Sequence, residues 1–212
     1  MPEPALTVHQ LPRGRHGLPR EAVVRSQRAR ILDAMAEVMA ENGYVKTSVA
    51  MIIKRARVSR ETFYEQFRSK EDCFEAAYER AAELLLTRLT ETAQAQSDSA
   101  SERLDILLRA YLEGVAGEPA YARLFLVEVY AAGSTAIARR MALQDSFAAL
   151  LWEALGATTE DQRFACQTLV AAISGLVTAR VAAEDLDGLR ALREPLAAMV
   201  RRGGPLYGSA EI

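Results

Sequence analysis

The spacing of proline constrains the fold of this chain more than any other feature. No proline occurs between Pro19 and Pro119, and only Pro195 interrupts the stretch from Pro119 to Pro205. Because proline disrupts the interior of a helix, these long stretches leave room for long helices. Within them apolar residues recur at helical spacing, and alternating runs of Val, Ile and Thr with hairpin dipeptides do not occur. The pattern predicts an all-α fold of about nine helices.

Start and stop signals divide the chain into three segments. Residues 1–20 carry four prolines and both histidines and are expected to form a flexible leader. Residues 21–70 are expected to hold three short helices, the second opened by Thr47 and the third by Ser59. Residues 71–212 are expected to hold the remaining helices as a separate body.

Capping signals mark several helices of that body. Ser69 with Asp72 is typical of the start of a helix, here one that reaches about residue 95. Thr158 with Asp161 is expected to cap the eighth helix in the same way. The last helix is expected to bend at Pro195.

The scarcity of histidine and cysteine excludes most catalytic chemistry. His9 and His16 both fall in the expected leader, and Cys73 and Cys166 lie 93 positions apart without a CxxC pair. A histidine base, a histidine-ligated metal or a disulfide framework is therefore not expected. We expect no enzyme, no metal site and no cofactor. Burial of the two thiols is favoured over a redox-sensing role.

Neither a membrane span nor a signal peptide is expected. The longest stretch without Asp, Glu, Lys or Arg covers residues 164–179, which is shorter than the roughly 20 residues that a span needs. The first 20 residues contain no apolar run. These features predict a cytoplasmic protein.

Charge is distributed unevenly although the net charge is only −2. Residues 1–72 hold 13 Lys or Arg and 9 Asp or Glu, an excess of +4, which leaves −6 for the rest. All three lysines of the chain fall between Arg13 and Lys70. A basic segment on an acidic body suits a polyanionic partner at one end, although charge alone is equally compatible with a solvated surface.

The second and third expected helices form a helix-turn-helix pattern. In the connecting segment 56–59, Val58 is expected to fill the angle between the helices and Ser59 to cap the next one. Phe63 and Phe67, four residues apart, are expected to face inward together. The other side of the helix is then left for contacts outside the domain.

These residues resemble the TetR family of transcriptional regulators over about residues 25–74. The resemblance is carried by Asn42-Gly43-Tyr44, Thr47, Val58-Ser59, Thr62-Phe63-Tyr64, Phe67 and Ser69-Lys70-Glu71. It implies that residues 21–70 are a DNA-binding domain and that residues 71–212 bind a ligand and dimerise. Three positions depart from the family pattern, since Arg57 replaces a usual glycine and Ile53 and Glu61 replace usual small residues. A left-handed Arg57 costs about 1–2 kcal/mol relative to glycine.

By this resemblance the third helix enters the major groove of double-stranded DNA. Arg60 is the expected base reader, because a guanidinium can pair with guanine through two hydrogen bonds. Thr47 and Ser59 can alternatively serve only as caps, and Tyr64 can lie half in the core. The full set of expected DNA contacts is Arg28, Tyr44, Thr47, Ser48, Arg57, Ser59, Arg60, Thr62, Tyr64, Gln66 and Lys70.

The resemblance also implies a homodimer on a near-palindromic operator. The eighth and ninth helices suit the interface, with burial inside one subunit as the alternative. The residues expected there are Phe164, Leu169, Ile173, Leu176, Val177, Leu192, Leu196 and Met199.

A small-molecule inducer is expected to bind among the helices of the body. Its expected contacts are Tyr78, Tyr111, Tyr121, Phe125, Glu128, Phe147 and Trp152, each of which can also be ordinary core. For Glu128 an ion pair with Arg109 or Arg123 is preferred over a ligand contact. The sequence thus favours a homodimeric repressor that a small ligand releases from DNA. The alternatives are a ligand-independent regulator or activator and, less favoured, an all-α enzyme or adaptor.

Overall fold

The computed structural model describes residues 19–93 and 99–208, which form ten α-helices and two short 3-10 helices with no strand. Residues 1–18, most of the expected leader with His9 and His16, lie outside the described ranges. The helices in chain order are α1 (Arg20–Asn42), α2 (Val49–Ala56), α3 (Arg60–Gln66), α4 (Lys70–Ala93), α5 (Ala100–Gly117), α6 (Pro119–Leu126), η1 (Glu128–Ala131), α7 (Ser134–Leu155), α8 (Glu160–Ala182), α9 (Leu186–Ala191), α10 (Arg193–Gly203) and η2 (Gly204–Leu206).

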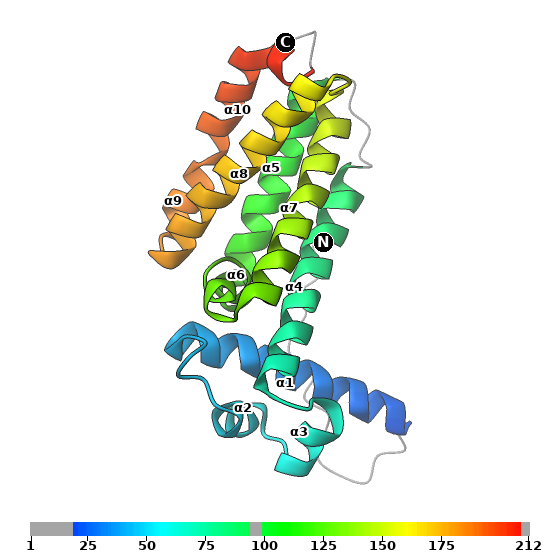
Figure 1. The fold of residues 1–212 in the computed structure, drawn as a ribbon, viewed down its shortest axis with the longest axis vertical. Coiled ribbons are helices and arrows are strands. Elements are labelled where there is room, and N and C mark those ends of the chain that lie inside the picture. Colours follow the sequence, from blue (N-terminus) through cyan, green and yellow to red (C-terminus); the bar gives the residue numbers. More distant parts are fainter. Residues whose placement is uncertain (1–18, 94–98, 209–212) are drawn as a thin grey trace, which may run out of the picture.

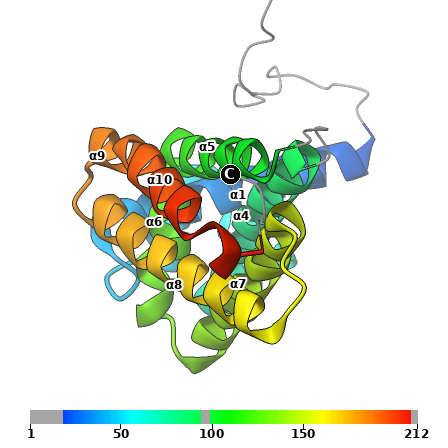
Figure 2. The ribbon, with the colours of Figure 1, turned by 90° about the horizontal axis from the view of Figure 1, so that it is seen from above.

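Two parts of unequal size lie one above the other (Figure 1). Helices α1–α3 form a small head, and α4 leads from the head into a body of roughly parallel and antiparallel helices. Helix α1 crosses beneath the body and packs against α4 and α6 as well as α2. Viewed from above, α8 lies at the periphery of the body beside α7 (Figure 2).

One continuous cluster of buried side chains runs from the head into the body. Four of its aromatic rings form a row, with centroid separations of 5.3 Å for Tyr44 and Phe74, 6.1 Å for Phe74 and Tyr78, and 5.0 Å for Tyr78 and Phe125. Rings at these separations are in contact. The head and body are therefore packed as one unit, which α4 joins.

Several helix boundaries differ from the sequence expectation because the caps differ. Ser48, not Thr47, caps α2, and a capping box of Thr159 with Gln162, not Thr158 with Asp161, opens α8. The expected last helix is broken at Leu192, ahead of Pro195. Proline is tolerated in the first turn of α10, so it requires no bend there.

Candidate nucleic-acid interface and ligand cavity

The turn between α2 and α3 is built from two caps and one left-handed residue. The hydroxyls of Ser48 and Ser59 each accept the backbone N–H three residues further on, at 3.3 and 3.0 Å. Arg57 ends α2 with φ 54° and ψ 46°, which confirms the left-handed conformation expected there. Phe63 and Phe67 are buried, as expected, with ring centroids 5.6 Å apart.

The outer face of this turn is cationic and exposed. Arg57, Ser59, Arg60 and Tyr64 are all exposed, and the guanidinium of Arg60 lies 5.5 Å from the ring centroid of Tyr64. Within the described ranges neither Arg57 nor Arg60 forms an ion pair. Arg55, by contrast, is neutralised by two glutamates of α1. The unpaired arginines are thus available to a polyanion.

Three expected DNA contacts are directed inward by the structure. The side chain of Thr47 is 3% exposed, and its hydroxyl donates to the Gly43 carbonyl at 2.8 Å. Tyr44 is buried, with its hydroxyl 3.4 Å from Glu71. The Oε1 atom of Gln66 is buried without a hydrogen-bond partner. Thr47 and Tyr44 thus make contacts within the head, which corrects their expected placement on the DNA-facing surface, and Gln66 directs its oxygen inward without a partner.

Lys70 and Glu128 each form a hydrogen bond with the backbone of Tyr44. The ammonium of Lys70 donates to the Tyr44 carbonyl at 3.1 Å and lies 4.1 Å from the ring centroid. The carboxylate of Glu128 accepts the Tyr44 backbone N–H at 2.8 Å. Burial, together with the charge of Glu71, raises the pKa of Tyr44 to about 12, so its hydroxyl is neutral. Tyr44 therefore ties η1 of the body to the first residue of α4.

The other carboxylate oxygen of Glu128 faces Arg123. The two atoms, Oε1 of Glu128 and Nε of Arg123, are 3.4 Å apart. This contact confirms the ion pair that the sequence favoured for Glu128. Arg109, the other candidate partner, pairs with Asp105 instead.

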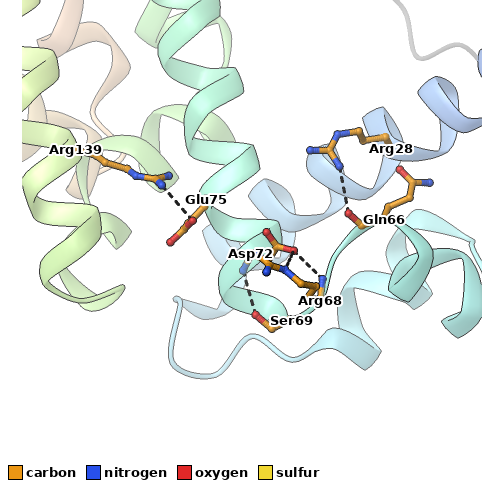
Figure 3. Close-up of polar contacts among 7 residues, drawn as sticks. All are labelled: Arg28, Gln66, Arg68, Ser69, Asp72, Glu75 and Arg139. Atoms are coloured by element: carbon orange, nitrogen blue, oxygen red, sulfur yellow. Dashed lines mark hydrogen bonds and ion pairs between the residues drawn. The ribbon is translucent and has the colours of Figure 1, made fainter.

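A second polar network fixes the base of α4 (Figure 3). The Asp72 carboxylate accepts the backbone N–H of Arg68 at 2.8 Å, and the Ser69 hydroxyl accepts the N–H of Asp72 at 3.2 Å. Arg28 of α1 donates to the Gln66 carbonyl at 3.4 Å. The Arg68 hydrogen bonds hold the pKa of Asp72 below its usual value. The expected cap of α4 is confirmed, since Ser69 and Asp72 each satisfy a free N–H.

The same network links α4 to the body. Arg139 of α7 lies 3.3 Å from Glu75 and 3.0 Å from Glu79, both on α4 (Figure 3 for Glu75). These pairs are partly exposed and are each worth little alone. The next residue of α7, Arg140, is buried instead.

A cavity of about 80 Å³ lies inside the body between α5, α7 and α8. Its wall is almost wholly apolar, and Arg140, Gln144 and Ser174 are its main polar members. The apolar lining is Leu89, Leu104, Leu107, Leu108, Tyr111, Phe125, Leu126, Phe147, Leu150, Leu151, Val170 and Ile173. The volume is well below the roughly 300–1,000 Å³ of open ligand pockets, so a larger ligand must displace the wall.

Arg140 is buried at the edge of this cavity, with 6% of its surface exposed. Its guanidinium donates to the Ser174 hydroxyl at 2.7 Å, the Tyr130 hydroxyl at 3.1 Å and the Phe125 carbonyl at 3.3 Å. All of these acceptors are neutral. Within the described ranges no carboxylate lies within ion-pair distance of Arg140. A buried cation without an opposite charge is unusual in proteins.

Comparison with known proteins identifies the head. The family described as bacterial regulatory proteins, tetR family, matches residues 31–77, which run from α1 into α4. The match identifies the helix-turn-helix head as a domain of the tetR type. A head of this type binds DNA in bacterial regulatory proteins.

A curated relative extends the likeness beyond the head. The fatty acid metabolism regulator protein of Bacillus subtilis (strain 168) is 31% identical over 94 residues, which cover 44% of this chain and 48% of the relative. The chain thus spans about half the length of the relative it matches.

Solved structures share the fold over most of the chain. The fatty acid degradation regulator FadR of Bacillus halodurans has a TM-score of 0.73 and 23% identity, and covers 87% of this chain and 96% of its own. FadR of Bacillus subtilis in complex with stearoyl-CoA has a TM-score of 0.67 and 22% identity. The match covers 81% of this chain and 96% of that one. A TetR-like transcriptional regulator of Rhodococcus sp. RHA1 has a TM-score of 0.64 and 24% identity. The match covers 88% of this chain and 99% of that one. These likenesses show the fold.

The expected ligand contacts divide into two groups. Tyr111, Phe125 and Phe147 line the cavity beside Arg140. The other four do not line it: Tyr78 stacks on Phe125, Tyr121 donates to Asp33 at 2.8 Å, Glu128 pairs with Arg123, and Trp152 donates to the Arg163 carbonyl at 3.1 Å.

Sequence reasoning missed Arg140, although a signal was present. Arg140, Leu143, Phe147 and Leu151 are spaced by three or four residues and so share one face of α7. An arginine on an apolar face is a candidate buried cation.

The expected dimer residues also divide into two groups. Leu169, Ile173, Val177, Leu192 and Leu196 are buried within the subunit itself. They have no surface left for a partner, which corrects their assignment to the interface. Phe164, Leu176 and Met199 are 69%, 45% and 37% exposed. The helical periodicity predicted an apolar stripe and gave no sign of which side the body already covers.

Helix α8 is the one described helix with the length and apolar composition of a membrane span. Only 33% of its most apolar window is buried inside the chain. Core helices of soluble proteins pass the same test, and α8 packs on α7 and α6. Its apolar outer side nonetheless needs a partner.

Both cysteines are buried and free. Burial raises the pKa of Cys73 to about 12 and that of Cys166 to about 11. The thiolate is the reactive form, so neither side chain suits redox sensing in the folded state.

Proposed function

We propose that this regulator is a cytoplasmic homodimeric repressor that an acyl ligand releases from a near-palindromic DNA operator. The observation that carries the proposal is a row of contacts that runs from Phe125 in the cavity wall, through the aromatic rings of α4, to Tyr44 and Lys70. This row joins the apolar cavity to the DNA-binding head.

At the DNA end, Arg60 is the base reader. It is exposed and unpaired within the described ranges, on the open side of a turn that two serine caps hold rigid. Arg57, Ser48 and Ser59 lie beside it and contact phosphates, as does Arg28. Thr62 is weaker as a contact, because its hydroxyl is 2.9 Å from that of Ser59.

At the ligand end, the apolar lining suits a hydrocarbon chain. A helical body without an internal cavity would have favoured a ligand-independent regulator, but a cavity is present. A structural neighbour was solved with stearoyl-CoA, and the curated relative is a fatty acid metabolism regulator. We therefore infer that the ligand of this chain is a fatty acid or its thioester.

Between the two ends, Phe125 transmits the displacement. Phe125 lines the cavity and stacks on Tyr78 of α4, and the aromatic row continues through Phe74 to Tyr44. It also borders a second cavity, of about 250 Å³, between α4, α5 and α6, so the ring has space to move. A ligand that enlarges the first cavity thus shifts α4 and, with it, the angle of the head.

A second copy of the chain covers the outer side of α8. The exposed positions of that helix are mostly apolar or small, and small residues permit close helix approach. They include Phe164, Gln167, Thr168, Ala171, Ala172, Gly175, Leu176 and Ala179. A helix that is apolar on every side must be covered on every side. Two heads held at a fixed separation then match two half-sites.

The test is fluorescence anisotropy with DNA from upstream of the chain's own coding sequence, with and without stearoyl-CoA and hexadecanoate. We expect salt-sensitive binding that either acyl compound weakens at least tenfold. Binding that no acyl compound changes would support a ligand-independent regulator. A reporter that gains expression when the protein is deleted identifies a repressor, and one that loses expression identifies an activator.

A further inference from the structure

The strongest unexplained feature of the body is the buried charge of Arg140. Its five N–H groups face only neutral acceptors, namely Tyr130, Phe125, Ser174 and, at 3.4 Å, the Thr178 hydroxyl. At least one N–H of Nη1 is left without an acceptor among the described residues. Hydrogen bonds to neutral groups solvate a guanidinium but do not compensate its charge. The structure therefore holds a cationic site whose counter-ion is not part of the described chain.

Two further polar groups near Arg140 have no partner of their own. The Tyr78 hydroxyl is buried without a hydrogen bond. Burial raises its pKa to about 12, and the charge of Arg140 opposes that rise, which places the two groups within electrostatic reach of each other. Gln144 is one turn along α7 from Arg140, lines the same cavity and forms no hydrogen bond with the described residues. A polar ligand head in the cavity would supply a hydrogen-bond partner for Gln144, whereas Tyr78 lies outside the cavity lining.

The rest of the cavity defines what is attached to that head. The leucines of α4, α5 and α7, with Phe147 and Tyr111, offer an apolar surface and no charge. A ligand that fits both ends is an anion on a hydrocarbon chain. A carboxylate matches the guanidinium fork in size and geometry and supplies the missing charge. A thioester carbonyl accepts a hydrogen bond but brings no charge.

We propose that Arg140 is the receptor for the carboxylate of a straight-chain monocarboxylic acid, whose hydrocarbon chain occupies the apolar cavity. The proposal rests on the proposed function and names the head group of its ligand. Arg140 donates to the carbonyl of Phe125, near the end of α6. A bound carboxylate competes for this guanidinium and loosens its hold on Phe125, at the start of the aromatic row to the head.

The test compares ligands that share one hydrocarbon chain and differ in their head group. Their binding to the full-length protein without DNA is measured by isothermal titration calorimetry. The probes are dodecanoate, dodecan-1-ol and dodecanoyl-CoA, each below its micellar concentration, with hexanoate and hexadecanoate to cover chain length. We expect a carboxylate to bind roughly tenfold or more tightly than the alcohol, as a charge-assisted hydrogen bond requires. Equal affinities for acid and alcohol, binding of the thioester alone, or no binding of any probe would overturn the proposal.

Variants at two adjacent positions assign the preference to Arg140. In Arg140→Gln the preference for the acid over the alcohol is expected to vanish while the alcohol still binds. Arg140→Lys keeps the charge and is expected to retain part of the preference. Arg139→Gln is the matched control, because Arg139 pairs with Glu75 and Glu79 outside the cavity, and it is expected to keep the full preference. An Arg140→Gln variant that still prefers the acid contradicts the assignment.

The two proposals fail in different ways. If dodecanoate binds through Arg140 but leaves operator binding unchanged, the proposed release mechanism is wrong and the anion site stands. If the thioester releases the DNA and the acid does not bind, the release mechanism stands and the Arg140 site is wrong. The wild-type comparison of head groups decides this even where a variant fails to fold.

Discussion

The carboxylate of Glu128 accepts a hydrogen bond from the backbone N–H of Tyr44 at 2.8 Å, across 84 residues of sequence. Glu128 is 8% exposed and also faces Arg123 at 3.4 Å. The N–H of Tyr44 lies just past Gly43, which ends α1 with φ 76°. A single carboxylate thus fixes the end of a head helix to the segment that follows α6.

Replacement of Glu128 by leucine is expected to lower stability strongly. It leaves the Tyr44 N–H unsatisfied, at about 1–3 kcal/mol, and removes the charge facing Arg123. Glu128→Gln keeps an oxygen for Tyr44 and loses only the charge, so it should cost less. Chemical denaturation of the three proteins measures both differences. Equal stability of the leucine and glutamine variants would show that the hydrogen bond to Tyr44 contributes nothing.

Arg60→Ala and Lys70→Ala are expected to weaken DNA binding in different ways. Loss of a base-reading guanidinium should cost about 1–3 kcal/mol and relax the preference at one base position. Lys70 is held against Tyr44 at the base of α4, so its loss should weaken all sequences alike and reduce the salt slope by about one. Anisotropy titrations on an operator and its single-base variants, at several salt concentrations, separate the two. An unchanged base preference in Arg60→Ala would remove it as the reader.

Arg57→Gly is expected to stabilise the protein slightly and to weaken its binding to DNA. Glycine removes roughly 1–2 kcal/mol of left-handed strain at φ 54°, and its greater freedom in the unfolded chain offsets about 0.5–1 kcal/mol of that. The lost guanidinium is unpaired within the described ranges, so no ion pair is broken. A thermal melt and a salt titration of DNA affinity test the two parts. Lower stability would show that Arg57 makes a contact that outweighs its strain.

The fold of the head was predictable because each of its signals is local. The cap at Ser59 and the inward pair Phe63 and Phe67 depend on neighbours within a few residues, and the left-handed Arg57 was expected from the resemblance to the TetR family. Periodicity likewise predicted the all-α class, although the caps of α2 and α8 were misplaced. Thr47 was misplaced because Ser48 beside it offers an equivalent cap, and only the packed structure selects one.

The features that the sequence did not reveal depend on which side of a helix the rest of the body covers. Ile173 and Leu176 are both apolar residues of α8, three positions apart, yet Ile173 is buried and Leu176 is exposed. Arg140 and Arg139 are the same residue type in adjacent positions, and one is buried while the other pairs with α4. Such distinctions follow from tertiary contacts, which local spacing does not specify.

Neither cysteine is expected to react with iodoacetamide at pH 8 in the folded protein. With a pKa of about 12, Cys73 has roughly one thiolate per ten thousand molecules at that pH, and Cys166, at about 11, only somewhat more. The pKa of each thiol is higher in the folded protein than its ordinary value of 9.0. The stability that each thiol contributes is therefore present below pH 9 and is lost as the pH rises above it. Mass spectrometry of alkylated protein from pH 8 to 11 measures the first effect, and denaturation over that range measures the second. Rapid labelling of either native thiol at pH 8 would restore the redox-sensor hypothesis.

Gly175→Arg is expected to convert the dimer to a monomer without unfolding it. A side chain at Gly175 meets nothing within 4 Å in the subunit, and arginine favours a helix interior over glycine by up to about 1 kcal/mol. On the proposed interface it blocks the close approach of a second α8. Sedimentation velocity should then show half the mass, circular dichroism the same helix content, and operator affinity a fall of about 10²–10⁴ as two-site binding is lost. Gly117→Arg, where a side chain also meets nothing within 4 Å, is the control and should stay dimeric. A Gly175→Arg protein that remains a dimer would place the subunit contact elsewhere.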